Sequence, residues 1–163
     1  MDTKTLQQLD LTNFKTQIAQ VLGLPSERVV GSFSQVIDDD NPFIAVKVLN
    51  ITQKGREYKF CSDETEIITT TKEANIEITA YGNNALAVIQ KLNTLFYSSM
   101  MIKAFNTCGL GLVAVSQIRD LTLNFGAGVE QRASIDITCS YINRVKVSQN
   151  AINTAEVGVK VNR

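Results

Sequence analysis

The sequence contains no histidine, and this absence excludes more chemistry than any residue present suggests. Without an imidazole there is no Ser-His-Asp or Cys-His nucleophile system, and no histidine-based metal site. An enzyme built on carboxylates or lysine remains possible. No cofactor is expected from the residues that remain.

Cysteine is also scarce. The three cysteines, Cys61, Cys108 and Cys139, are odd in number and widely spaced. That pattern excludes a fully paired disulfide framework and lacks the paired spacings of zinc sites. A free cysteine behaves as a small hydrophobic residue, so we expect buried thiols. The stretch CSDE at residues 61–64 could only be catalytic with a partner base, and none is offered.

The chain lacks an excess of charge of either sign and lacks long apolar runs. Sixteen lysines and arginines balance sixteen aspartates and glutamates, which argues against a general attraction to nucleic acid or anionic lipid. No apolar run approaches the roughly 18 residues needed to span a membrane. The polar start MDTKTLQQLDLTNF has no signal-peptide core. We therefore expect a protein that is made and kept in the cytoplasm, with no membrane partner.

The apolar positions that are present predict three helices. Residues 9–22 carry apolar side chains at spacings of three and four, and Gly23 and Pro25 end that helix. Asn83 or Asn84 can cap a second helix whose apolar face runs from Ala85 to Phe96. A shorter helix follows at residues 99–106 and ends at Gly109.

Strand patterns dominate the rest of the chain. The clearest is residues 128–142, where Ala133, Ile135 and Ile137 alternate with polar side chains in the period of a half-buried strand. We expect its apolar side to pack on the helix of residues 85–96. The other predicted strands are residues 28–33, 43–52 followed by a tight turn at 53–56 and a hairpin partner at 56–63, then 64–82, 112–119 and 121–125.

These elements predict one α+β domain, an antiparallel β-sheet with helices packed on one face. A chain of 163 residues is long enough to bury a core without a metal or a disulfide. We place the domain at residues 1–143. Residues 144–163 are weakly alternating and polar, and we expect them to form an arm or edge strand that reaches a neighbouring subunit or partner.

Three short motifs admit more than one interpretation. The run Asp38, Asp39 and Asp40 is a solvated loop, a negative patch, or part of a calcium site, although it lacks the ligand spacing of an EF-hand. GLGLV at residues 109–113 lacks the third glycine of a dinucleotide fingerprint, which favours Gly109 as a helix C-cap. The basic residues Arg144, Lys146, Lys160 and Arg163 are a solvated segment or a phosphate contact.

One long region, residues 76–142, resembles the tail-terminator-like proteins of tailed bacteriophages, the phage neck terminator proteins. In that family a strand ends in a Tyr-Gly turn, a helix follows, and the chain then passes a GL-type strand and a DLT segment to an alternating strand. Upstream, Pro42-Phe43 resembles the family's strand opening. The other matching positions are Tyr81-Gly82, Ala85, Leu92, Gly109-Leu110, Asp120-Leu121-Thr122, Glu130 and Arg132-Ala133.

The resemblance implies a ring-forming structural subunit of the virion, with no catalysis. The ring would be a homohexamer that caps the tail tube, ends its polymerisation and joins it to the head-side connector or neck proteins. DNA would pass through the lumen without specific binding. An alternative in the same class is a neck or tail-completion adaptor between portal and tail. Host-cell cytoplasm would be the place of assembly, and the tail–neck junction of the virion the final location.

The residues expected at the lumen or at a subunit interface follow from the polar side of the long strand and its surroundings. They are Asp38, Asp39, Asp40, Glu130, Arg132, Asp136, Thr138, Arg144 and Lys146. Two other classes stay open: a carboxylate enzyme using Glu73 or Glu77 near Tyr81 in a pocket, and a DNA-binding module with a basic face.

Overall fold

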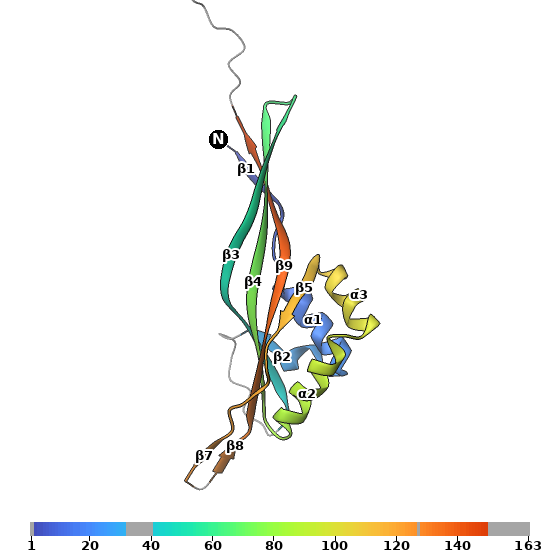
Figure 1. Cartoon of the computed structure of the whole chain (residues 1–163), viewed down its shortest axis with the longest axis vertical. Coiled ribbons are helices and arrows are strands. Elements are labelled where there is room, and N and C mark those ends of the chain that lie inside the picture. Colours follow the sequence, from blue (N-terminus) through green and yellow to red (C-terminus); the bar gives the residue numbers. More distant parts are fainter. Residues whose placement is uncertain (1, 32–40, 127, 150–163) are drawn as a thin grey trace, which may run out of the picture.

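Three very long strands form the centre of the molecule, as Figure 1 shows for the computed structural model, which describes residues 2–31, 41–126 and 128–149. They are β3 (Phe43–Cys61), β4 (Thr65–Tyr81) and β9 (Arg132–Ser148). Strand β4 lies between the other two and is antiparallel to both. Alternating β-branched residues over such lengths favour extended backbone throughout.

Shorter strands complete the seven-stranded sheet, whose order is β1-β9-β4-β3-β2. Strands β1 (Thr3–Gln7), β5 (Leu110–Val115) and β6 (Arg119–Asp120) each pair with β9. On the opposite edge, β2 (Val29–Gly31) runs parallel to the start of β3. Strands β7 (Leu123–Phe125) and β8 (Gly128–Glu130) form a separate small hairpin.

Three α-helices cover one face of this sheet. Helix α1 (Leu11–Leu22) begins at Asp10, whose side chain accepts a hydrogen bond from the Asn13 amide at 2.9 Å. It ends at Gly23, which adopts the left-handed conformation that a C-cap glycine allows. Helices α2 (Ala85–Leu95) and α3 (Ser99–Thr107) follow β4. A 3-10 turn, η1 (Ser26–Arg28), leads into β2.

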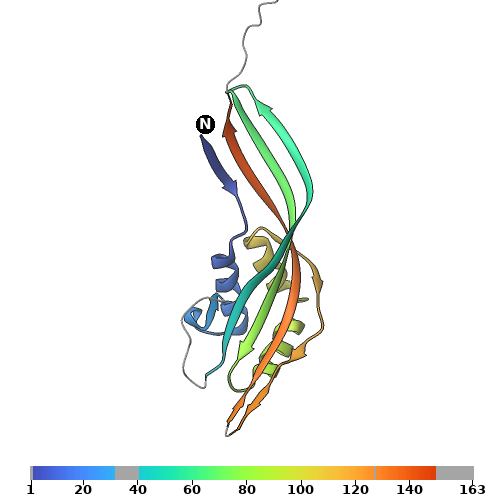
Figure 2. The ribbon, with the colours of Figure 1, turned by 90° about the vertical axis from the view of Figure 1, so that its left-hand side faces the viewer.

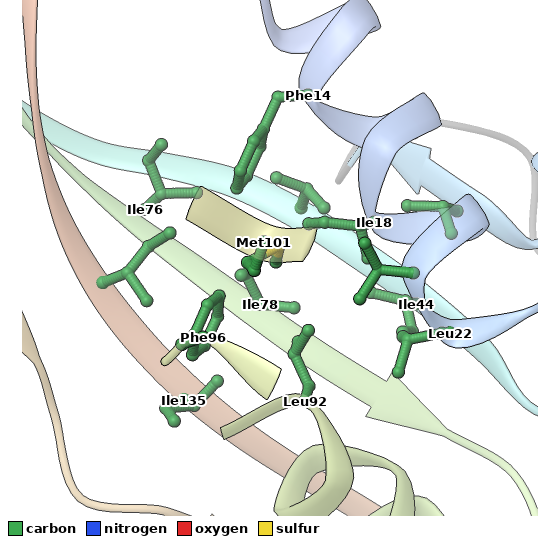
Figure 3. Close-up of a cluster of buried hydrophobic side chains, with 14 of the residues drawn as sticks. Phe14, Ile18, Leu22, Ile44, Ile76, Ile78, Leu92, Phe96, Met101 and Ile135 are labelled. Atoms are coloured by element: carbon green, nitrogen blue, oxygen red, sulfur yellow. The ribbon is translucent and has the colours of Figure 1, made fainter. Parts of the chain in front are cut away.

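The hydrophobic core lies between the helices and the sheet (Figure 3). Ala133, Ile135 and Ile137 of β9 are at most 1% exposed and face α2, as the sequence predicts. The α+β prediction, an antiparallel sheet with helices on one face, is therefore confirmed. The largest fully buried side chains are Phe14, Phe96, Ile18, Ile44, Ile76, Ile78, Ile89, Leu92, Met101, Ile135 and Ile137.

The helices cover only part of the sheet's length (Figure 2). Beyond them project residues 53–61 of β3, 65–71 of β4, 142–148 of β9 and strand β1, which we call the sheet arm. Most side chains of β3 in the arm are exposed, including Tyr58 at 46% and Phe60 at 72%. The arm therefore has no helical layer of its own among the described residues.

The predicted tight turn at residues 53–56 is wrong. Strand β3 continues through it to Cys61, and the chain turns at residues 62–64 instead. The glycine that suggested a turn, Gly55, follows a register shift between Gln53 and Gly55, so it marks a β-bulge. A glycine inside a strand pattern fits a bulge as well as a turn, and the equally long partner β4 decides between them.

Several other strand boundaries differ from the predicted ones. The strand predicted at residues 28–33 is only Val29–Gly31, and the one at 112–119 divides into β5 and β6. Strand β1 was not predicted because all five of its side chains are exposed and it shows no apolar alternation. Strand β9 continues to Ser148, past the expected boundary at residue 143, and its residues 144–148 pair with β4. Residues 150–163 lie outside the described residues.

Candidate interface on the polar face of the sheet

The side of β9 that faces away from the helices carries the polar residues that the sequence marks as interface candidates. Register with β4 places Arg132 opposite Tyr81, Asp136 opposite Glu77, and Thr138 opposite Asn75. Cross-strand neighbours on one face lie close enough for their side chains to interact. These pairs, with the residues of β3 and β6 that touch them, are called the polar face below.

Asp136 and Glu77 are two carboxylates directly opposite each other, an arrangement that is destabilising unless a cation lies nearby. Arg119 of β6 supplies it. Its Nη2 lies 2.7 Å from Asp136 Oδ1 and 3.3 Å from Glu77 Oε1. Its Nε donates to the Oγ of the fully buried Ser134 at 3.0 Å. The guanidinium therefore fixes the short strand β6 against β9 and β4.

Thr138 begins a second polar group that crosses three strands. Its hydroxyl donates to Asn75 Oδ1 of β4 at 2.7 Å, and Asn75 Nδ2 donates to Asn50 Oδ1 of β3 at 2.9 Å. The hydrogen bonds are satisfied along the row, so the side chains are held in fixed orientations. This part of the surface is rigid and uncharged.

Arg132 lies at the end of the sheet and behaves differently from Arg119. Its guanidinium carbon lies 5.1 Å from the centre of the Tyr81 ring. That ring in turn stacks on Phe43 of β3, with centroids 4.8 Å apart and an 8° interplanar angle. The Arg132 Nε is buried without a hydrogen-bond partner, and no ion pair to Arg132 occurs in the described part of the chain. A rigid, stacked arginine with unused donors is typical of an interface anchor.

Arg144 and Lys146 lie on the same side of β9 but far along it, in the sheet arm. Arg144 Nε donates to Thr69 Oγ1 at 3.2 Å, and the side chain borders a shallow depression of about 230 Å³ with Glu57 and Lys59. Lys146 pairs with Asp63 at 2.9 Å. Hydrogen bonds from Thr65 and Lys146 lower the pKa of Asp63, and the Asp63 carboxylate raises the pKa of Lys146.

The predicted interface residues therefore form two groups and not one site. Arg132, Asp136 and Thr138 share the polar face, while Arg144 and Lys146 belong to the arm. Six residues, ~20 Å of strand at 3.3 Å per residue, separate Thr138 from Arg144. Glu130 is exposed in β8. Asp38, Asp39 and Asp40 lie outside the described residues. The sequence alone did not point to Arg119, Asn75 or Asn50. Only the strand register brings Arg119 and Asn75 to β9 and brings Asn50 to Asn75.

The geometry does not support the carboxylate enzyme. Glu73 pairs with Lys54 at 3.0 Å and Glu77 pairs with Arg119, so both carboxylates have cationic partners. Over residues 2–31, 41–126 and 128–149, no cluster of three His, Cys, Asp or Glu side chains could hold a metal. Within the same ranges, no helix has the length and apolarity that crossing a membrane requires.

Comparison with known families identifies the family of the chain. The family model described as phage neck terminator protein matches residues 13–163, nearly the whole chain. No curated protein matches the chain. A neck terminator is a structural component of the phage virion and not an enzyme. The chain belongs to the phage neck terminator protein family.

Proposed function

We propose that the protein forms a ring that caps the end of the phage tail tube, stops its polymerisation and joins it to the head-side connector. The observation that carries this proposal is the family match over residues 13–163. It is supported by a structure whose potential contact surfaces are extended, and in which the two carboxylates considered for catalysis, Glu73 and Glu77, are engaged in ion pairs.

Such a cap works by covering the surface that recruits tube subunits and by presenting a different surface in its place. The end of a growing tube offers unpaired strand edges and apolar patches that recruit the next subunit. A terminator covers that end with one ring face and presents an unlike face to the neck. Contacts between unlike surfaces of identical subunits close into a ring when the rotation between neighbours divides a full turn. A homohexamer is the stoichiometry that we propose.

Within the ring, the polar face is our candidate for the subunit interface or the lumen wall. Arg132 has no ion pair within the described residues, so its guanidinium can bind a carboxylate of the neighbouring subunit without breaking one there. Charged pairs across an interface fix register more than they add affinity. Asp136 and Glu77 are already paired with Arg119, so we propose that they hold β6 in place and do not contact the neighbouring subunit.

Asp38, Asp39 and Asp40 lie outside the described residues, and we propose that they face the lumen. Negative charge there would keep passing DNA from adhering to the wall. We expect the triple substitution of these residues to asparagine to leave assembly intact and to slow DNA delivery. Unchanged delivery, measured by infectivity of complemented virions, would assign them to a solvated loop.

The decisive experiment is the mass of the purified protein by light scattering, alone and with tail-tube subunits, together with tube lengths by electron microscopy. A ring in solution or on tube ends, with elongation halted, supports the terminator. Binding to the portal ring with no effect on tubes would favour the alternative, a neck or tail-completion adaptor. A monomer that ignores both partners would contradict both proposals. Assembly in the host cytoplasm before virion release is part of the same proposal.

A further inference from the structure

The two edges of the main sheet are built differently. Along β9, the outer edge is lined by three short strands, β1, β5 and β6. The opposite edge is β3, a strand of 19 residues whose only outer neighbour in the described parts of the chain is β2. Strand β2 covers only residues 44–46 of β3. The edge formed by residues 47–61, called the open edge below, has a strand on one side only.

The open edge is long and presents groups that can bind another strand. At about 3.3 Å per residue it extends over ~50 Å, and a free edge exposes unpaired backbone N–H and C=O groups along that length. It also carries large apolar side chains that are well exposed, at 49% for Ile51, 46% for Tyr58 and 72% for Phe60. Lysines and two bulges protect it partly, and Arg56 lies 5.0 Å from the centre of the Tyr58 ring. Ile51 and Phe60 gain nothing from exposure to water.

The chain itself contains a segment with the pattern of a strand that could cover this edge. In residues 150–163, Val157, Val159 and Val161 alternate with small or polar residues, and β-branched residues at alternate positions favour a strand. These fourteen residues lie outside the described part of the chain, and fully extended they reach ~46 Å. Their possible reach is thus close to the length of the open edge.

The place where this segment leaves the fold favours a neighbouring copy as its acceptor. At the end of β9, the Ser148 amide donates to the Asp2 carbonyl at 2.9 Å and the Gln149 amide to the Glu64 carbonyl at 2.8 Å. The chain therefore emerges at the tip of the sheet arm, with β4 and β3 between it and its own open edge. Pairing in the same molecule would require it to cross two strands before it could begin to pair.

We propose that residues 150–163 of one copy add as a strand to the open edge of β3 in a second copy. Main-chain hydrogen bonds would supply the affinity, and the alternating valines would supply the side-chain contacts. Donor and acceptor are different surfaces, so the contact runs head to tail and can close into a ring. The inference rests on the self-association in the proposed function and adds the segment and the surface that carry it.

The test compares two substitutions in the full chain that differ only in their ability to donate a backbone hydrogen bond. Val159→Pro removes an N–H and disfavours strand pairing, whereas Val159→Thr keeps both the N–H and the β-branched shape. In the wild-type oligomer and in the threonine variant, hydrogen exchange should be slow at the amides of residues 49–60 that point away from β4, in addition to those that β4 already protects. In the proline variant the outward-pointing amides should exchange at least ~10-fold faster, and light scattering should show smaller species.

Three other results would contradict the inference, and each has a different meaning. An oligomer that persists in the proline variant, with unchanged exchange at residues 49–60, would overturn this inference and leave the ring intact. If the wild-type monomer, at any concentration, shows slow exchange at these outward-pointing amides, and the proline variant loses it, the segment covers its own edge. That outcome would also overturn the inference. A wild-type protein that stays monomeric, even with tail tubes, would overturn the proposed function as well.

Discussion

At the scale of single residues, the thiol of Cys139 shows how burial changes acid–base behaviour. The side chain is fully buried, and burial, aided by the nearby Cys108, raises the pKa of Cys139 to about 12 from an ordinary value of 9.0. Because the folded-state pKa is raised, the associated stability is complete below pH ~9 and is lost as the pH rises toward 12. Below that window the thiol contributes only as a small buried apolar group.

We therefore expect the free energy of unfolding to fall above pH 9, by about 1.4 kcal/mol per pH unit for this thiol. Cys139→Ala should be less stable at pH 8 but should show a shallower decline between pH 9 and 10.5. Cys61→Ala, at the half-exposed Cys61, is the control and should keep the wild-type slope. Urea unfolding at several pH values measures the free energy of unfolding. An equal decline with pH in the wild type and both variants would contradict this account.

Two glycines test whether a left-handed backbone conformation determines the cost of replacing glycine by alanine. Gly23 has a φ of +70° and Gly55 does not have a positive φ, yet a Cβ at either would meet no atom within 4 Å. Gly23→Ala should cost about 1 kcal/mol because an L-residue is strained in the left-handed region. Gly55→Ala should be neutral or slightly stabilising, because alanine loses less entropy in a strand. Thermal unfolding of both variants checks this, and equal losses would show that the strain argument is wrong.

Two arginines near the same strand separate folding from assembly. Arg119 is paired with Glu77 and Asp136, whereas Arg132 stacks on Tyr81. We expect Arg119→Gln to reduce the free energy of unfolding by about 1 kcal/mol, since it leaves two carboxylates facing each other on a partly exposed surface. We expect Arg132→Gln to leave unfolding nearly unchanged and to weaken ring formation. Urea unfolding measures the stability of each variant and light scattering measures ring formation. A destabilised Arg132→Gln and an Arg119→Gln that only weakens ring formation would contradict these assignments.

At the scale of elements, α2 is held in place by one side only. Leu92 is fully buried in the core, whereas Leu86, six residues and about 1.7 turns earlier, is 37% exposed. Leu92→Ala should therefore cost about 3 kcal/mol through lost burial and the cavity left behind. Leu86→Ala should cost less than ~1 kcal/mol. Similar losses for the two variants in urea unfolding would mean that the helix packs differently.

The long strands place constraints on any truncation. Residues 144–148 of β9 pair with β4, and 144–147 also pair with β1, so removal of everything after residue 143 would damage the fold as well as the proposed arm. A chain that ends after Gln149 keeps every described strand. It should fold with wild-type core stability, and by the inference above it should fail to form rings. Loss of cooperative thermal unfolding in that chain would show that the last residues belong to the core.

At the scale of the whole molecule, the sheet divides into a half covered by helices and an arm that is not (Figure 2). The covered half holds the core and supports the polar face. The arm exposes Tyr58 and Phe60 and ends where the last residues leave the fold. We expect this exposed apolar surface to be a place of contact with another subunit or neck protein.

The sequence by itself determined the positions of the helices, the core side of β9 and the class of function. Periods of two and of three to four placed the helices and the core side of β9 correctly, because burial acts on each element's own repeat. The absence of histidine and the order of the family motifs already pointed away from catalysis and toward the neck terminators.

Only the tertiary structure decided which side chains meet and which edges stay open. The turn expected at residues 53–56 became a bulge because β4 pairs along the whole of β3, a long-range effect with no local signal. The polar face likewise depends on register, which sets Arg119 between Glu77 and Asp136 and leaves Arg132 without an ion pair in the described part of the chain. The open edge of β3 follows from strand order, which no local pattern in the sequence encodes.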